Sequence, residues 1–179
     1  MPPRFHRELL AAFLIFLPTL VFAAPEAAGR LYRVDLAGVG SCYDADLSLM
    51  LPAHVFAYLE PGALEVYFPN PPAGINQREK VFLLGDQTDN FPGEGSRFLI
   101  NAVLGHDVLL AFDAVSRSAS GTLLAYVYLP SDGTCVNFKL IRDGLTRVSP
   151  PDAAFQFRAE FEMYQQQAKE NRRGIWGRN

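Results

Sequence analysis

The chain has 179 residues, of which 49% are hydrophobic and 20% are charged, and its formal net charge is −3. This length and composition are typical of one ordinary globular domain and exclude a low-complexity protein. The acidic balance also disfavours tight, sequence-independent binding to nucleic acid, because that affinity comes mainly from Lys and Arg side chains that neutralise phosphates.

The N-terminus has the features of a secretory signal peptide. Arg4 and Arg7 precede an apolar run over residues 9–23, and small residues at Ala23 and Ala24 offer a cleavage site. The run is short for a membrane span and contains Pro18. We therefore expect a periplasmic or secreted protein with no membrane span after cleavage. An uncleaved membrane anchor is the alternative.

Patterns typical of β-strands follow this leader. Residues 31–36 alternate between apolar and polar side chains, which predicts a short extra strand. The runs 54–59 and 63–68 flank a Glu-Pro-Gly turn and predict a hairpin. The apolar run 81–84 predicts a further strand, which ends at Gly85.

A helix and two more strands are predicted in the middle of the chain. Apolar residues recur at helical spacing after Pro92, and Gly105 is placed to end that helix. The runs 108–112 and 123–129 are rich in apolar and aromatic residues and predict strands. Five or more strands interrupted by one helix favour a small barrel.

Two helices are predicted near the C-terminus. Asn137 is expected to be the N-cap of a short helix over 138–143. The last helix is expected to begin after Pro150 and Pro151, with Asp152 as its cap, and to bury Phe161 and the later Trp176 against the barrel.

The two cysteines, Cys42 and Cys135, are the only ones in the chain. An even number of cysteines in an exported protein predicts a disulfide bond between them. Two buried free thiols are the alternative.

The C-terminal half resembles the staphylococcal nuclease (thermonuclease) family. Residues 123–129 read Leu-Leu-Ala-Tyr-Val-Tyr-Leu, like a strand of that family. Residues 136–148 include Asn137 and end with Gly-Leu-Thr-Arg-Val, and Gly-Ile-Trp follows at 174–176, near the C-terminus. The resemblance implies a mainly β fold with some α structure, a five-stranded OB-fold barrel carrying about three helices. The expected organisation is a signal peptide at 1–23, an N-terminal extension that is partly strand at 24–53, and the OB-fold domain at 54–179.

The resemblance also implies a nuclease active site, whose groups this chain replaces. The family uses two aspartates and a backbone carbonyl to hold calcium, a glutamate beside the attacking water and two arginines on the phosphate. Thr88, at the position of the carbonyl ligand, is kept. Phe82 and Thr122 stand at the positions of the two arginines, and Gly62 and Gln87 stand at those of the two aspartates. Asn90 stands at the position of the glutamate.

A rebuilt calcium site is the alternative to this loss. A rival alignment uses the acids at 44–47 in place of the turn before Ala63, and its site would combine Asp46, Asp86 and Asp89, with Arg117 near the second lost arginine. A shift of one residue in an extended segment points a side chain elsewhere, which disfavours this site. In that case alone the protein would be a calcium-dependent nuclease for DNA or RNA.

The leading prediction is therefore a pseudoenzyme. Such a protein would be a catalytically inactive binding or structural module of the cell envelope, with no cofactor. Its partner would be an envelope protein, a peptide or a glycan, since OB barrels often serve as binding domains.

Overall fold

The computed structural model describes residues 36, 39–60, 62–87 and 93–177. The predicted leader and the strand predicted at 31–36 lie outside these residues, except for Leu36, which is buried and is not in a strand. In the part of the chain that is described, no helix is long and apolar enough to cross a membrane.

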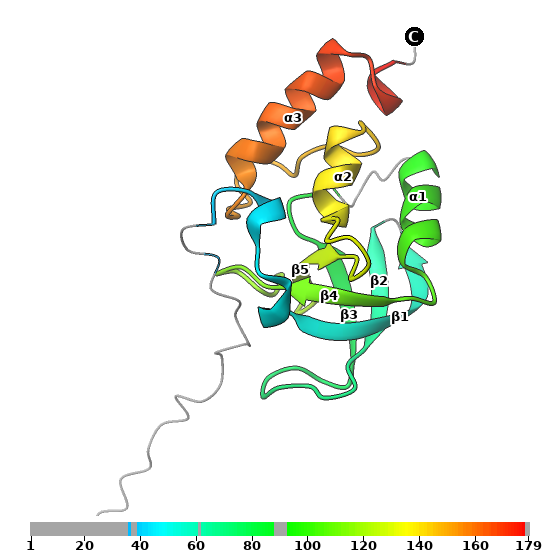
Figure 1. Cartoon of the computed structure of the whole chain (residues 1–179), viewed down its shortest axis with the longest axis vertical. Helices are drawn as coiled ribbons and strands as arrows, with labels where there is room; N and C mark the ends of the chain where they lie inside the picture. Colours follow the sequence, from blue (N-terminus) through cyan, green and yellow to red (C-terminus); the bar gives the residue numbers. More distant parts are fainter. Residues whose placement is uncertain (1–35, 37–38, 61, 88–92, 178–179) are drawn as a thin grey trace, which may run out of the picture.

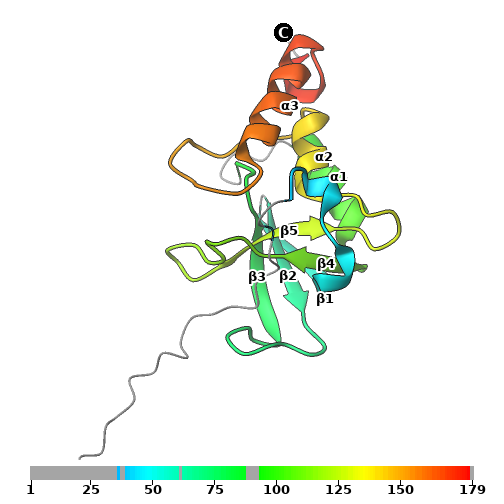
Figure 2. The ribbon, with the colours of Figure 1, turned by 60° about the vertical axis from the view of Figure 1, so that its left-hand side comes forward.

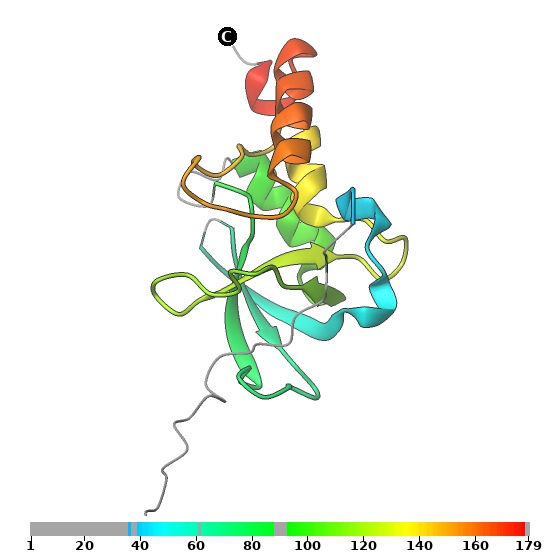
Figure 3. The same ribbon diagram turned by 90° about the vertical axis from the view of Figure 1, so that its left-hand side faces the viewer.

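Five strands form a closed barrel, as the sequence analysis predicted, and their order is β1-β2-β3-β5-β4. Figures 1 and 3 show the barrel with three α-helices gathered toward one side of it. The strands are β1 (Leu51–Glu60), β2 (Ala63–Tyr67), β3 (Arg78–Leu83), β4 (Asp107–Ala111) and β5 (Leu123–Tyr128).

The predicted hairpin is confirmed as the antiparallel pair β1 and β2, in which Val55 faces Val66. Strand β1 begins earlier than expected, at Leu51, because its first residues pair with β4, with Leu51 opposite Leu110. The parallel pair of β3 and β5 aligns Val81 with Leu123 and joins the two halves of the barrel.

Helix α1 (Gly93–Val103) packs on the barrel where the sequence predicted a helix. Its buried Leu99 and Val103 belong to the core cluster inside the barrel. The backbone N–H of Gly105 donates to the carbonyl of Val55 at 2.8 Å. Gly105 has a φ of 75°, a conformation that glycine adopts without strain after a helix.

Helix α2 (Val136–Arg142) corrects the role predicted for Asn137. The N-cap is Cys135, and Asn137 lies inside the first turn with its side chain fully buried. Its Oδ1 accepts from the N–H of Val127 at 2.8 Å, and its Nδ2 donates to the carbonyls of Leu84 and Ala125 at 2.9 and 3.0 Å. Asn137 therefore ties α2 to β5 and to the end of β3.

Helix α3 (Arg158–Glu170) begins later than predicted, and Phe157, not Asp152, is its N-cap. The preceding segment follows the barrel surface because Phe155 and Phe157 are buried there, and the ring of Phe157 lies 5.0 Å from that of Tyr126. Phe161 is fully buried, as predicted.

The burial predicted for Trp176 is also corrected, because this residue is only half-buried, in the short helix η4 (Gly174–Trp176). Arg147 and Lys169 lie over its ring, at 5.0 and 4.9 Å from the centroid.

Two short 3₁₀ helices precede the barrel, η1 (Cys42–Asp44) and η2 (Leu47–Leu49). Figures 1 and 2 show this segment beside α2. It is fastened to α3 by Glu160, whose carboxylate accepts from Ser41 Oγ at 2.6 Å and from the N–H of Cys42 at 3.0 Å.

The predicted disulfide is not formed in this structure. Cys42 and Cys135 are buried free thiols. A hydrogen bond with the Cys135 thiol, followed by burial, raises the pKa of Cys42 far above its ordinary value. The two thiols are therefore neighbours, although the bond between them stays a prediction.

Candidate functional site

Strand pairing brings three of the positions singled out in the sequence, Gly62, Phe82 and Thr122, toward the region where β2, β3 and β5 meet. Ala63 pairs with Phe82 across β2 and β3, and Phe82 pairs with Leu124 across β3 and β5. Gly62 directly precedes Ala63, and Thr122 lies two residues before Leu124. The alignment of the hairpin turn with the family's aspartate stays a prediction.

Phe82 and Thr122, which the sequence analysis aligned with the two arginines of the family, carry no guanidinium. Phe82 is half-buried, and the ammonium of Lys80 lies 5.0 Å from the centroid of its ring. Thr122 is held in a turn, where its N–H donates to Ser118 Oγ at 3.2 Å and its hydroxyl lies 3.3 Å from Ser120 Oγ.

Arg117, which lies near Thr122 in the sequence, has a guanidinium that is already paired. It donates to Glu79 Oε1 at 2.8 Å and to the carbonyls of Gly121 and Gly74 at 2.7 and 2.9 Å. Burial of Glu79 opposes its ionisation, but its hydrogen bonds with Arg117 and Asn76 hold its pKa below the ordinary value. The pair is thus a structural tie between β3 and the loop before β5.

The three acids of the alternative calcium site have different surroundings. Asp46 is exposed and caps η2, where its Oδ1 accepts from the N–H and the hydroxyl of Ser48 at 2.9 and 2.7 Å. Asp86 is buried, and Asp89 lies outside the described residues, as do Thr88 and Asn90. Within 36, 39–60, 62–87 and 93–177, no three His, Cys, Asp or Glu side chains gather as metal ligands.

Calcium does not fit the described residues of this site. Calcium takes six to eight oxygen ligands, with carboxylates prominent among them. Gly62 has no side chain, and Gln87 is held through its backbone, whose N–H donates to the carbonyl of Arg147 at 2.8 Å. Asp86 would then be the only carboxylate supplied by these described positions.

Asp86 lies instead at a cavity of about 270 Å³ between the ends of β3 and β5 and the segment that leads to α3. It is 4% exposed, and neither carboxylate oxygen has a hydrogen-bond partner in the described structure. Burial, and to a lesser degree the neighbouring Cys135, raises its pKa well above the ordinary value of a carboxyl group. The hydroxyl of Ser149, which also lines the cavity, is likewise buried without a partner.

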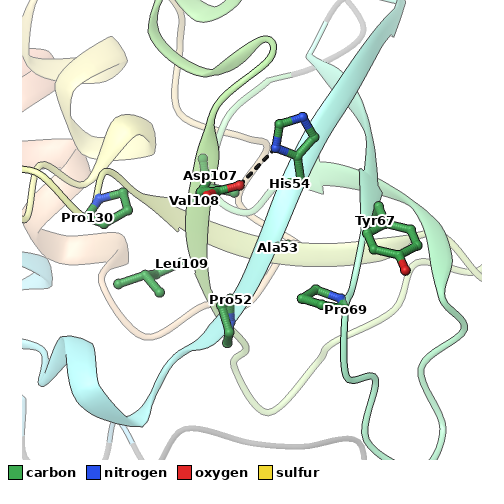
Figure 4. Close-up of a pocket in the computed structure, with 9 residues that line it drawn as sticks. All are labelled: Pro52, Ala53, His54, Tyr67, Pro69, Asp107, Val108, Leu109 and Pro130. Atoms are coloured by element: carbon green, nitrogen blue, oxygen red, sulfur yellow. Dashed lines mark hydrogen bonds and ion pairs between the residues drawn. The ribbon is translucent and has the colours of Figure 1, made fainter.

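A second hollow, of about 610 Å³, lies on the outer surface of β1 and β4. Figure 4 shows Leu109 and Pro130 on one side of β1, and Tyr67 and Pro69 on the other, with Pro52 between them. Apolar rings and methyl groups therefore line most of this groove. We call it the proline groove.

One end of the proline groove is polar. His54 Nδ1 and Asp107 Oδ1 are 2.8 Å apart, and the Asp107 side chain is 82% exposed (Figure 4). The groove lining contains no Ser, Thr or Cys that this pair could activate as a nucleophile. The sequence analysis missed the pair, because the two residues are 53 positions apart and meet only through the pairing of β1 with β4.

A comparison of the sequence with known protein families supports the same fold. The family model described as staphylococcal nuclease homologue matches residues 72–178, which is more than half of the chain. No curated protein matches the sequence. Strands β1 and β2, including the turn at Gly62, precede the matched span.

Proposed function

We propose a function from the premise that this chain belongs to the staphylococcal nuclease homologue family, as the match over more than half of its residues shows. In this proposal the protein keeps the barrel of the family but does not cleave nucleic acid. It acts as a binding or structural module of the cell envelope, outside the cytoplasm.

One observation supports the proposal, namely that in the described residues no free guanidinium lies at Phe82 or Thr122, between β3 and β5. Phe82, which we align with one arginine, has only the ammonium of Lys80 over its ring, and the guanidinium of Arg117 is paired with Glu79. Donors that stabilise charge in a transition state typically contribute about 10²–10³ each to the rate. Cleavage would need two such donors and a metal, so the described residues supply no route to it.

A cleavage assay tests the proposal. Purified protein lacking residues 1–23 is incubated with single-stranded DNA, duplex DNA and RNA, with calcium or with a chelator. We expect no cleavage above a buffer control. Cleavage that needs calcium, is lost in Asp86→Ala and persists in Asp107→Ala would contradict the proposal. Cleavage equal in all three proteins would identify a contaminating nuclease.

The proline groove is the contact surface in this proposal. Its three prolines and Tyr67 offer flat apolar surface, and the exposed carboxylate of Asp107 gives one end a negative charge. Apolar walls with one charged end fit an extended peptide segment that has apolar side chains and one basic residue. A segment of an envelope protein is therefore the partner we infer, in preference to a glycan.

Site-specific photocrosslinking tests this surface. A photoreactive residue replaces Tyr67 in the groove or, as the control, Met163, which is 49% exposed on α3. We expect a crosslinked species in the envelope from position 67 but not from 163, and expect Asp107→Lys to reduce it about tenfold through charge reversal. Crosslinking that is equal at both positions, or unchanged by Asp107→Lys, would argue against the groove.

The location and the cysteine pair can be tested on the same material. We expect the protein in the periplasmic or secreted fraction, with its N-terminus near residue 24. The contact between the thiols of Cys42 and Cys135 supports their oxidation to a disulfide in that compartment. Mass mapping without reductant should recover the two cysteines in one linked peptide pair, whereas two alkylated peptides would rule the bond out.

A further inference from the structure

Positive charge is concentrated in the C-terminal part of this acidic protein. Residues 36–135, which include all five strands, contain four Lys and Arg against eleven Asp and Glu, whereas residues 136–179 contain eight against five. Figures 1, 2 and 3 show that the C-terminal end of α3 and η4 form the end of the molecule that lies away from the barrel. The barrel is therefore acidic, and the part that projects from it is basic.

Several cations of this basic part are paired with acids, but others are not. Lys139 and Arg142 both contact Asp143, at 2.7 and 3.2 Å. Arg158 contacts Glu162 at 2.9 Å. Four exposed cations make no ion pair with any described residue, and they are Arg147, Lys169, Arg172 and Arg173.

Trp176 brings two of the unpaired cations together. The guanidinium of Arg147 lies 5.0 Å from the centroid of its ring, and the ammonium of Lys169 lies 4.9 Å from it. A cation–π contact positions a cation over the ring and does not neutralise its charge. The nearby acid Glu170 is directed elsewhere, because its carboxylate accepts from Gln166 at 3.0 Å, one turn back along α3. Two positive charges from different segments of the chain therefore lie beside one indole.

Backbone contacts fix this arrangement. The N–H of Ile175 donates to the carbonyl of Gly144 at 2.9 Å, which fastens η4 to the turn after α2. Gly144 permits this approach, because a Cβ at its position would collide with the carbonyl oxygen of Arg173. The fold itself thus presents the charges. We call this surface the basic end, and it consists of Arg147, Lys169, Arg172, Arg173 and Trp176.

A broad anionic surface fits the basic end better than a single small anion or a nucleic acid. Each Lys or Arg near an anionic bilayer strengthens binding about fivefold, so several cations on one projecting end add their effects. Tryptophan is suited to the headgroup region of a bilayer, because its ring is apolar and its N–H is polar. A bilayer can also contact this end while the acidic barrel stays away from it, whereas a long nucleic acid would be repelled wherever it met the barrel.

We propose that the basic end docks on an anionic phospholipid bilayer, so that the barrel, which carries the proline groove, lies away from the membrane. This inference rests on the proposed location in the cell envelope, which would supply such a bilayer. It does not depend on the loss of cleavage or on the partner of the proline groove.

The test uses the single tryptophan of the chain as a reporter, because Trp176 belongs to the basic end. Protein lacking residues 1–23 is mixed with vesicles of equal parts phosphatidylglycerol and phosphatidylcholine, or of phosphatidylcholine alone. Tryptophan emission and cosedimentation measure binding. Arg147→Gln and Lys169→Gln each remove one charge, and Arg78→Gln is the matched control. Arg78 is exposed on β3 of the barrel and also lies over an aromatic ring, that of Phe56, at 5.2 Å.

We expect binding to the anionic vesicles, with a blue shift of the emission, and no binding to phosphatidylcholine alone. Binding should be lost in about 1 M salt, where the Debye length is about 3 Å. Arg147→Gln and Lys169→Gln should each weaken the affinity about fivefold, and Arg78→Gln should weaken it by less than about twofold.

Four results would overturn the proposal. They are the absence of binding to the anionic vesicles, equal binding to phosphatidylcholine, an equal effect of Arg78→Gln and Arg147→Gln, and displacement from the vesicles by single-stranded DNA at equal phosphate concentration. The last result would assign the basic end to nucleic acid. Thermal unfolding checks the fold of each variant, and Lys169→Gln decides if Arg147→Gln does not fold. Cleavage and crosslinking are measured separately, so a failure here is distinguishable from a failure of the proposed function.

Discussion

Two buried polar side chains near the end of β3 have opposite surroundings. Asn137 makes three hydrogen bonds to the backbone of β5 and to Leu84, and it joins helix α2 to the barrel. Asp86, two residues beyond Leu84, is almost as deeply buried and makes no hydrogen bond through its carboxylate in the described structure. Of two polar groups with similar burial, one therefore stabilises the fold and the other opposes it.

This difference distinguishes a polar side chain that the fold requires from one that the fold does not require. Hydrogen bonds such as those of Asn137 are required for the barrel and the helix to meet, whatever the protein does. A carboxylate without partners has no such structural reason, and unsatisfied buried groups are more frequent at functional sites than elsewhere. The contrast can be tested by changing each side chain in turn.

Removal of Asn137 should give the largest effect. In Asn137→Ala the N–H of Val127 and the carbonyl of Leu84 lose their partner inside the core, so we expect a loss of about 3 kcal/mol or more in the free energy of unfolding. Urea unfolding measures it. Asn171→Ala, at an exposed amide on the end of α3, is the control and should change stability by no more than about 0.5 kcal/mol.

Replacement of Asp86 should have the opposite sign. Because its carboxylate has no partner, Asp86→Leu should raise the free energy of unfolding at pH 7 by about 1–3 kcal/mol when no ligand is present. Urea midpoints of the two proteins give the comparison. A destabilised Asp86→Leu would mean that the carboxylate has a stabilising partner, and the contrast with Asn137 would fail.

The pH dependence of stability should show the same carboxylate. The pKa of Asp86 in the folded protein is raised above the ordinary value of 3.8, mainly by burial. The contribution of this group to the free energy of unfolding is therefore fully present below pH 3.8 and is lost as the pH rises through the folded pKa. Relative to Asp86→Asn, the wild type should lose up to about 1.4 kcal/mol per pH unit in this range. Parallel stability curves for the two proteins from pH 4 upward would contradict the prediction.

The smallest effect is expected at Ser149. Its hydroxyl has no partner, while its backbone N–H is held by Gly85, so Ser149→Ala should be neutral or should stabilise by at most about 1 kcal/mol. Thermal unfolding is sufficient to measure this change in stability. A loss of more than about 1 kcal/mol would show that the hydroxyl has a partner.

The sequence predicted the barrel well because its signals were local. The turn at 60–62, the apolar and aromatic run of β5 and the glycine after α1 each depend on neighbouring residues. The start of α3 was predicted too early because Asp152 fits a cap, whereas the burial of Phe155 and Phe157 decides where the helix begins. Trp176 was predicted to be buried because it would fold back onto the barrel with Ile175 after the last helix, but two cations cover its ring instead.

The site was less predictable because its properties depend on distant contacts. An asparagine near a helix start is compatible with a cap or with a buried tie, and only the approach of β5 makes Asn137 the latter. The sequence identified Asp86 as a candidate metal ligand, but it gave no sign that the carboxylate would be buried alone. Likewise, nothing in the order of residues placed His54 beside Asp107.

The closed barrel restricts how this protein can meet any partner. Each of the five strands already pairs with a neighbour on both sides, because β1 is bonded to both β2 and β4. Among the described residues, the barrel therefore has no strand with a whole free edge to which a partner chain could add a strand through main-chain hydrogen bonds. Recognition has to depend on side chains, so it should change with single surface substitutions, and the folded barrel should resist edge-to-edge aggregation.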